Sequence, residues 1–457
     1  MVSLILMGCE TLALDTQDEF FKKFVNFIRE YVPNCSSVLL AVSGGVDSIV
    51  MLDLFNRAKD ELLINIGVAT FNHKLRTEAD DEVIFVQKFC EGLGIPFFPG
   101  EADVKMYCEQ NKLSIEEGAR ILRYEFLKRT AKENGYSFIA TAHNANDLLE
   151  TIILRQIKGT GPFGLAAIKP INGIFIRPLI FFTRKEIEEY AKERKLEYVI
   201  DRTNFDIEYN RNFVRHKIVP LLKEINPSVE SAYLKLAKNI WELDSYVDRA
   251  IGIDKSNLEK IGNNFIFKLV NDEYLQIEQI RRYSLLLFGK PLDYEKLERF
   301  KKARSSGKPS YKISFWGALG IEISYGWCMM GDIVNYPVFE KIVCFDGSKE
   351  FELIEANGYF IKFTKYDIIN KKEHTNVCFK VRNWRDGDRL LSGKKVKELF
   401  SERKVPTFLR KLIPLVFLSE SEQDSKVIYI PFLYEAKSYL NDIGVFIKTK
   451  GGFHFES

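Results

Sequence analysis

The sequence has few cysteines and few histidines, and this scarcity excludes several classes of protein. Among 457 residues there are seven cysteines and five histidines, and no two cysteines form a CxxC pair. We therefore expect neither a cysteine-rich zinc site nor a framework of disulfide bonds. Scattered cysteines of odd number are typical of the reducing interior of a cell, so we expect a cytoplasmic protein.

Long apolar runs and an excess of charge of one sign are also missing. The N-terminal stretch MVSLILMGC faintly resembles a lipoprotein cleavage site, but it is short and no basic residue precedes it, so we expect no membrane partner. The 66 Lys and Arg against 63 Asp and Glu give a net charge of +3. Any basic surface for a nucleic acid must therefore be local.

The length and the pattern of apolar residues predict several domains. A chain of 457 residues exceeds one ordinary core. Residues 38–182 alternate short apolar runs with helical patterns, which predicts a Rossmann-like α/β fold with a parallel sheet between helices. Helical spacing continues to about residue 303, and short strand patterns follow. We expect a catalytic domain at 18–224, a helical linker domain at 225–308 and a small β-rich (α+β) domain at 309–457.

The order of the predicted elements indicates where a ligand binds. The predicted strands are VLLAV, LINIGVATFN, IPFFPG, FIATAH and IFIRPLI. The predicted helices span 46–58, 77–92, 115–134 and 145–157. Ligands of parallel sheets bind beyond the carboxyl ends of the strands. We therefore expect the residues that follow the first, second and fourth strands to converge on one site.

The stretch VLLAVSGGVDSIVMLDLF, residues 38–55, places a glycine-rich turn between a strand and a helix. Such a turn binds anions, because backbone N–H groups and the helix dipole face outward. Asp47 would repel a phosphate unless a cation lies between them, so we expect Mg²⁺ to bridge Asp47 and phosphate oxygens. A plain strand-to-helix turn is the alternative. The residues expected to form the phosphate site are Ser43, Gly44, Gly45, Val46, Asp47 and Ser48.

Polar and charged side chains also follow the second and fourth predicted strands. They are Asn72, His73, Arg76, His143, Asp147 and Glu150. Asp147 and Glu150 are spaced i,i+3 on a predicted helix, so they share a face. Two carboxylates there are candidates for holding Mg²⁺ or a substrate ammonium group. An acidic first turn that suits the helix dipole is the alternative.

The helical stretch SIEEGARILRYEFL, residues 114–127, carries charges that could face a nucleotide. Arg120 and Arg123 are spaced i,i+3, and Glu116 lies one turn before Arg120. Two guanidinium groups on one face suit a triphosphate. A solvated charged face is the alternative.

The turn SGGVDS resembles the PP-loop of the N-type ATP pyrophosphatases. Further motifs follow in order: NHKLR at 72–76, EEGARILRY at 116–124, AHNANDLLET at 142–151, KGTGPFGL at 158–165, RPL at 177–179, DRTN at 201–204 and RNFVR at 211–215. Together they resemble the tRNA(Ile)-lysidine synthetases over about residues 38–223, and the resemblance returns at 381–416. Each motif is weak alone, whereas their order and spacing are specific.

The resemblance implies a ligase that uses ATP and Mg²⁺. Its substrates would be L-lysine and an isoleucine tRNA with a CAU anticodon. ATP would adenylate the C2 carbonyl oxygen of the wobble cytidine and release pyrophosphate. The lysine ε-amine would then attack C2 and release AMP. The resemblance also implies that subunits pair as a homodimer.

Each candidate residue receives a role within this scheme. The expected catalytic residues are Asp47, Asp147, Glu150 and Arg120, and Asp47 is the expected metal ligand. The residues expected to complete the ATP site are Asn72, His73, Arg76, Arg120, Arg123 and His143. The acids expected at the substrate are Glu116, Asp147 and Glu150. The family has paired acids before the ET of the fourth motif, but here the first is Asn146. A metal-binding role of that position would have to pass to Asp147 or Glu150.

Two basic clusters are candidates for contact with RNA phosphates. Residues 381–411 contain ten Lys and Arg against four Asp and Glu, a local net charge of +6 that stands out in a chain of net charge +3. We expect Lys394, Lys395 and Lys397 to contact tRNA there, and Arg211 and Arg215 to do so beside the catalytic domain. A solvated basic face is the alternative for both clusters.

Other functions are open at this point. A tRNA thiolation enzyme would need a sulfur-carrying cysteine or a metal cluster near the loop. An amidating synthetase acting on a small metabolite would not explain the basic C-terminal region. A non-catalytic RNA-binding protein would have no use for an acid in a pyrophosphate loop.

Overall fold

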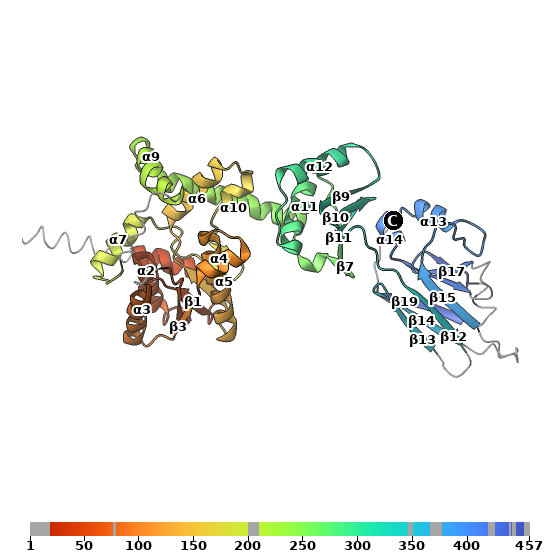
Figure 1. The fold of residues 1–457 in the computed structure, drawn as a ribbon, viewed down its shortest axis with the longest axis horizontal. Helices are drawn as coiled ribbons and strands as arrows, with labels where there is room; N and C mark the ends of the chain where they lie inside the picture. The colour runs from red at the N-terminus through yellow and green to blue at the C-terminus, as the bar shows by residue number, and fades with distance from the viewer. Residues whose placement is uncertain are drawn as a thin grey trace, which may run out of the picture. The chain divides into compact units, whose positions relative to one another are not determined.

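The computed structural model describes residues 19–75, 79–199, 210–345, 351–365, 377–418, 426–437, 440 and 445–451. Arg76 and the DRTN motif lie outside these ranges. The chain divides into two compact units, which lie within Met1–Ser245 and Tyr246–Ser457 (Figure 1). The predicted division into three domains stays a prediction.

The first unit contains the predicted parallel sheet, in the strand order β3-β2-β1-β4-β6-β5. All neighbouring strands are parallel except β5 and β6. Val38, Leu39 and Leu40 of β1 are fully buried, as expected for a central strand covered on both faces. The strands are β1 (Ser37–Ala41), β2 (Asn65–Asn72), β3 (Phe97–Glu101), β4 (Phe138–Thr141), β5 (Ile171–Asn172) and β6 (Phe175–Ile176). The predicted α/β fold is confirmed.

Helices cover both faces of this sheet. On one face, α2, α3 and α7 contribute to the core that contains Val38 and Leu40. On the other face, Phe126 and Leu127 of α5 pack against Leu39. Figure 1 shows α2 and α3 on the side opposite α5. The helices of this unit are α2 (Val46–Ala58), α3 (Ala79–Leu93), α4 (Val104–Asn111), α5 (Ile115–Glu133), α6 (Ala145–Ile157), α7 (Arg184–Glu193), α8 (Asn210–Phe213) and α9 (Val219–Ile225), with α10 (Val229–Ile251) crossing into the second unit.

The second unit contains three antiparallel sheets, in the strand orders β7-β8-β11-β10-β9, β12-β15-β16-β17-β18 and β13-β14-β19. The predicted linker region holds helices, and it also holds β7 (Glu259–Ile261) and β8 (Asn264–Lys268), which complete a sheet with strands beyond residue 309. The helices are α11 (Glu273–Phe288), α12 (Tyr294–Ser305), α13 (Val396–Glu402) and α14 (Thr407–Arg410). The other strands are β9 (Ser310–Trp316), β10 (Leu319–Ser324), β11 (Trp327–Asp332), β12 (Glu340–Phe345), β13 (Phe351–Ala356), β14 (Tyr359–Lys365), β15 (Val377–Asn383), β16 (Pro414–Leu418), β17 (Val427–Ile430), β18 (Tyr434–Glu435) and β19 (Val445–Gly451).

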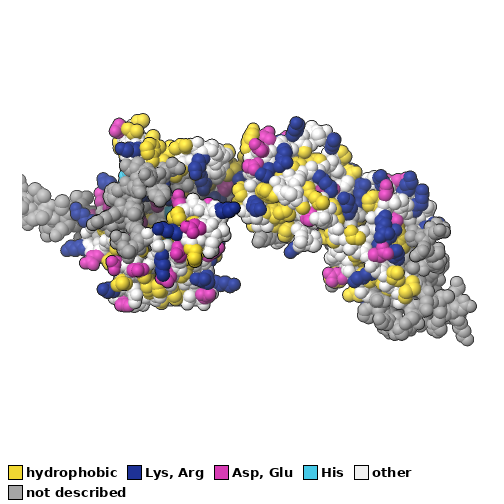
Figure 2. Space-filling model, viewed as in Figure 1, with side chains coloured by type: hydrophobic (Ala, Val, Ile, Leu, Met, Phe, Trp, Pro, Cys, Tyr) yellow, Lys and Arg dark blue, Asp and Glu magenta, His cyan; other side chains and the backbone are white. Residues whose placement is uncertain are grey.

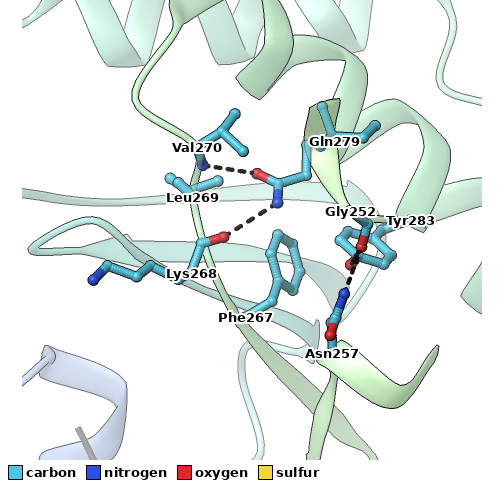
Figure 3. A pocket seen from close by; sticks show the side chains of 9 residues that line it. Gly252, Asn257, Phe267, Lys268, Leu269, Val270, Gln279 and Tyr283 are labelled. Atoms are coloured by element: carbon cyan, nitrogen blue, oxygen red, sulfur yellow. Dashed lines mark hydrogen bonds between the residues drawn. The ribbon is translucent and has the colours of Figure 1, made fainter. Parts of the chain in front are cut away.

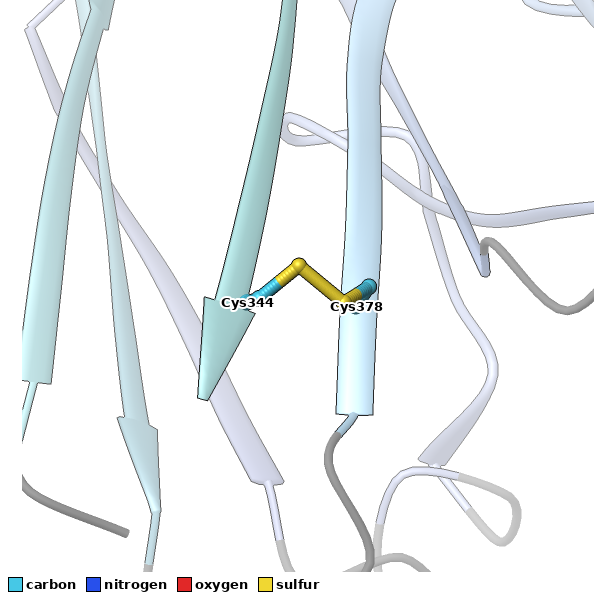
Figure 4. The surroundings of a disulfide bond; sticks show 2 residues. All are labelled: Cys344 and Cys378. Carbon is cyan, nitrogen blue, oxygen red and sulfur yellow. A yellow bond between two sulfur atoms is a disulfide. The ribbon is translucent and has the colours of Figure 1, made fainter. Parts of the chain in front are cut away.

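One disulfide bond joins Cys344 of β12 to Cys378 of β15 (Figure 4). The two residues are directly opposite in the antiparallel pair, with their Cα atoms 4.0 Å apart. The sequence predicted no disulfide framework, and this single bond is a departure from that expectation. Its cause is the strand register, which places two cysteines 34 residues apart side by side.

A cavity of about 280 Å³ lies in the second unit (Figure 3). The side-chain amide of Gln279 donates to the carbonyl oxygen of Lys268 at 3.1 Å and accepts from the N–H of Val270 at 3.2 Å. The Asn257 amide donates to the carbonyl oxygen of Gly252 at 2.8 Å. These side chains satisfy backbone groups at the wall of the cavity, so we interpret it as a feature of packing.

Candidate active site

A larger cavity, of about 540 Å³, opens at the carboxyl ends of β1, β2 and β4. β1 lies between β2 and β4, and the chain leaves β1 through α2 to reach β2. The cavity therefore lies at a topological switch point, where ligands of open parallel sheets bind. Residues after each of these strands line it, as the strand ends predicted: Ser43, Asn72, His73 and His143.

The loop between β1 and α2 is built to present N–H groups to the cavity. Gly44 has φ +88°, a conformation that favours glycine. Ser48 fixes the turn, because its hydroxyl donates to the carbonyl oxygen of Gly45 at 2.8 Å and accepts from the N–H of Ser43 at 3.2 Å. α2 begins at Val46, so the N–H groups of Val46 and Asp47 have no partner within the helix. Both residues line the cavity, so this helix start is a candidate anion site.

Asp47 faces the cavity with both carboxylate oxygens engaged. Its Oδ1 accepts from the amide of Asn144 at 3.0 Å, and its Oδ2 is paired with Nη1 of Arg184. Burial raises the pKa of Asp47 to about 6, and the nearby Asp147 adds to this rise while Arg184 opposes it. The buried carboxyl group is therefore costly to ionise, and positive charge at this point stabilises its ionised form.

Asn144 also starts α6 and thereby places Asp147. Its side-chain oxygen accepts from the N–H of Asp147 at 3.1 Å, and Oδ2 of Asp147 accepts from the N–H of Asn144 at 3.0 Å. This capping box satisfies N–H groups at the helix start. Oδ1 of Asp147 is 2.9 Å from Nη2 of Arg211. Burial alone would raise the pKa of Asp147, but Arg211, His143, the Asn144 N–H and Arg215 together lower it.

Glu150 is buried beneath two arginines and does not line the cavity. Its side chain is 3% exposed. Oε2 accepts from Nε of Arg211 at 2.8 Å, and Oε1 accepts from Nε of Arg215 at 2.6 Å. A π-helical turn, Val214–Ile218, includes Arg215, and such turns are frequent at functional sites. Arg211 and Arg215 line the cavity, so Glu150 fixes two guanidinium groups in its wall.

His143 lines the cavity as an uncharged ring. Its Nδ1 lies 2.9 Å from the hydroxyl of Thr141. Burial lowers the pKa of His143 to about 4; Arg177, Arg123 and Arg211 contribute further lowering, and Asp147 opposes it. A neutral His143 adds no positive charge to a cavity that already holds several guanidinium groups.

The two arginines predicted to share a helix face differ in their position relative to the cavity. Arg123 lines the cavity, whereas Arg120 and Glu116 lie outside the set of lining residues. Both guanidinium groups lie near the ring of Tyr124, at 5.6 Å for Arg120 and 5.7 Å for Arg123. Burial lowers the pKa of Arg211, but Asp147 and Glu150, with a smaller contribution from Glu116, raise it above its usual value.

Asn146, the position where the resemblance led us to expect an acid, connects three helices. Its side-chain oxygen accepts from the N–H of Arg184 at 2.9 Å, and its amide donates to Glu230 at 3.0 Å. Glu230 is buried and also pairs with Lys223 at 2.6 Å. Asn146 is not among the cavity-lining residues. It joins the start of α6 to the starts of α7 and α10.

The sequence missed Arg184 and Asn144, the two partners of Asp47. One signal could have found Arg184. It is the first residue of α7, directly after the N-cap Thr183, which forms a capping box with Glu186. A cation in the first turn opposes the helix dipole, so an arginine there indicates a specific anionic partner.

The basic stretch of the second unit contains both paired and unpaired lysines. Figure 2 shows dark-blue side chains gathered over the face that carries α13. Lys394 pairs with Glu402 at 2.5 Å. Lys395 and Lys397 are exposed, and no salt bridge is found for either within the described residues. These two lysines are therefore the better candidates for a phosphate contact.

No group of three or more His, Cys, Asp and Glu that could hold a metal occurs in the part of the chain that the structure describes. Asp47 and Asp147 line the cavity beside the glycine-rich loop, and Mg²⁺ prefers carboxylate and phosphate oxygens as ligands. Across the described ranges, no helix combines the length and apolarity that crossing a bilayer requires.

The fold and the glycine-rich loop place the first unit among the PP-loop domains, and a family profile described as a PP-loop domain matches residues 16–222. Use of ATP follows from this class of domain. A second profile, described as the TilS substrate C-terminal domain, matches residues 379–422.

Similarity to known proteins shows to which family of PP-loop proteins the chain belongs. The chain is 44% identical to the tRNA(Ile)-lysidine synthase of Thermosipho africanus, over 95% of this chain and 99% of the relative. It is 36% identical to that of a Thermotoga species, strain RQ2, over 92% and 98%, and 31% identical to that of Persephonella marina, over 86% and 92%. The chain belongs to the tRNA(Ile)-lysidine synthase family.

Proposed function

We propose that this chain ligates lysine to C2 of the wobble cytidine in the CAU anticodon of an isoleucine tRNA, with ATP as the source of energy. The observation that carries the proposal is one cavity lined both by the SGGVDS loop and by Arg123, His143, Asp147, Arg211 and Arg215. A phosphate site and a charged substrate site share this single space. We place the reaction in the cytoplasm, where tRNA and ATP meet.

The loop side of the cavity binds the phosphates that leave as pyrophosphate. The first-turn N–H groups of α2 and the serine hydroxyls donate to phosphate oxygens. Asp47 would hold Mg²⁺, which neutralises phosphate charge when it is bound. Asn144 supports this role because it fixes the direction of the Asp47 carboxylate.

The α6 side of the cavity binds lysine and the reacting cytidine. Asp147 presents negative charge to the lysine ammonium group. Arg123, Arg211 and Arg215 present positive charge to the lysine carboxylate and to the charge that develops on the adenylated base. Glu150 acts through Arg211 and Arg215 as a positioning residue, because its two oxygens are bonded to them.

Recognition of the RNA uses a loop whose bases are unpaired and can be turned out of the stack. Lys395 and Lys397 of the second unit would contact phosphates elsewhere on the tRNA. The match of residues 379–422 to the TilS substrate C-terminal domain supports this assignment.

The experiment combines the protein with ATP, Mg²⁺, radiolabelled lysine and unmodified isoleucine tRNA that carries CAU. We expect label in the RNA and equal amounts of AMP and pyrophosphate. Asp47→Asn should abolish transfer while tRNA binding, measured by filter retention, stays near that of the wild type. Arg194→Ala is the matched control, because Arg194 pairs with Asp53 outside the cavity. Label transferred from sulfide or ammonia donors and not from lysine would refute the proposal.

A further inference from the structure

Arg184 is paired with Asp47, the residue that would hold Mg²⁺ in the proposed function. The Asn144 amide donates to Oδ1 of Asp47 at 3.0 Å, and Nη1 of Arg184 is paired with Oδ2. Arg184 itself lines the cavity. The carboxylate proposed above to hold a cation is therefore paired with a cation of the protein itself.

The backbone of Arg184 is fixed while its side chain has a second partner. The N–H of Arg184 donates to Asn146 at 2.9 Å, and Arg184 begins α7 behind the Thr183 capping box. The side chain is 42% exposed, and its Nε donates to Glu188, one turn further along the helix, at 2.7 Å. The guanidinium group can therefore leave Asp47 by a change of side-chain rotamer, without movement of the helix.

We propose that Arg184 is a displaceable counter-ion, which holds Asp47 while the site is empty, yields Oδ2 to a divalent cation, and then pairs with the phosphate chain of ATP. A guanidinium group and a divalent cation on the same carboxylate oxygen repel each other at contact distance, so Arg184 and the ion compete for Oδ2. Phosphate oxygens are the anions that the incoming nucleotide supplies beside Arg184, and arginine binds them through two parallel hydrogen bonds. The inference rests on the proposed function, since it takes Asp47 as the metal ligand.

The test measures binding without turnover. Mn²⁺ is titrated into the nucleotide-free protein, and the free ion is followed by electron paramagnetic resonance. Binding of α,β-methylene-ATP, which cannot be cleaved between the α and β phosphates, is then measured by calorimetry with Mg²⁺ in excess. The variants are Arg184→Ala and Arg184→Gln, with Asp47→Asn to test the metal ligand. Arg194→Ala is the matched control, because it removes a different ion pair, between Asp53 of α2 and the residue that directly follows α7.

Loss of Arg184 should tighten Mn²⁺ binding about fivefold, since the ion no longer competes with a half-exposed ion pair. The same variants should bind the nucleotide analogue about tenfold more weakly. Arg194→Ala should change neither affinity. Circular dichroism establishes that the variants are folded, and Arg184→Gln keeps a polar side chain at the helix start.

Two failures are distinguishable. If Asp47→Asn binds Mn²⁺ as the wild type does, the metal ligand of the proposed function is wrong. If Asp47→Asn loses Mn²⁺ but both Arg184 variants bind it no more tightly than the wild type, the metal ligand stands and the displaceable counter-ion is refuted.

Discussion

Replacing Glu150 with glutamine removes the buried negative charge that Arg211 and Arg215 share. Glutamine keeps the shape of the side chain, but its amide hydrogens would face guanidinium hydrogens. Glu150 accepts three bonds from the two arginines, at 2.8, 2.6 and 3.1 Å. Oε2 accepts two of these bonds and Oε1 accepts one. A glutamine oxygen in the Oε2 position can therefore preserve two bonds without their full charge, while the bond from Nε of Arg215 is lost and an amide N–H faces that guanidinium group.

The free energy of unfolding should fall by about 2–3 kcal/mol in Glu150→Gln. Breaking a buried ion pair on one side costs about 3–5 kcal/mol, and hydrogen bonds to charged groups contribute about 1.5–3 kcal/mol each. The arginine side chains are 37% and 34% exposed, so water compensates part of the loss. Arg211 also keeps its ion pair with Asp147 at 2.9 Å, which further limits the loss of stability.

Urea titration followed by circular dichroism measures the stability, and transfer of labelled lysine to tRNA measures activity. A positioning role predicts lower stability and a lower kcat together, because both guanidinium groups lose their fixed direction. Glu189→Gln is the control, since Glu189 forms an exposed pair with Lys185 at 3.7 Å. If Glu150→Gln is as stable as the wild type and raises only the KM for lysine, Glu150 is a direct ligand of lysine and the positioning argument is wrong.

Three further variants test other parts of the molecule. The pKa of His143 falls from 6.5 to about 4 on folding, so the unfolded chain takes up the proton first as the pH is lowered. The stability advantage of the wild type over His143→Asn, measured by urea titration, should therefore shrink by up to about 3 kcal/mol as pH falls from 6.5 to 4. Parallel pH profiles of the two proteins would contradict this. Asn146→Asp should lower the free energy of unfolding by about 1–3 kcal/mol, because it removes the hydrogen-bond donor to the buried Glu230 and places a second negative charge beside it. If Asn146→Asp and Asn146→Ala melt at the same temperature, the added charge has no effect. The double variant Lys395→Ala, Lys397→Ala should weaken tRNA binding and reduce the slope of log binding constant against log salt concentration by about 1 to 2. Lys394→Ala should change this slope less, because Lys394 is already paired with Glu402. An unchanged slope in the double variant would show that these lysines do not contact the RNA.

Much of the first unit could be predicted because its signals are local. The pattern of β1 and α2 predicted a helix over 46–58, and α2 spans the same residues. Ligands of parallel sheets bind at the carboxyl ends of the strands. This rule predicted that Ser43, Asn72 and His143 share one site, and all three line the same cavity although they are distant in sequence. Each of these inferences needs only a few consecutive residues and a general rule of topology.

The partners of the charged groups could not be predicted, because they depend on packing between distant segments. Asp147 and Glu150 share a helix face, as their spacing indicated, yet the arginines that cover Glu150 come from a segment about 60 residues later. Whether Arg123 or Arg120 reaches the cavity depends on the rotation of α5 against the sheet. The pairing of Cys344 with Cys378 depends on the register of two strands, which no short pattern in the sequence specifies.

The bond between Cys344 and Cys378 changes how the chain responds to force. An unfolding machine that pulls the polypeptide through a narrow pore would meet a covalent ring between these residues. The 34-residue separation corresponds to about 110–120 Å of extended chain that the oxidised protein cannot release. In the oxidised protein, two segments of the chain would have to pass through the pore side by side. In the reduced protein, a single segment could pass at a time.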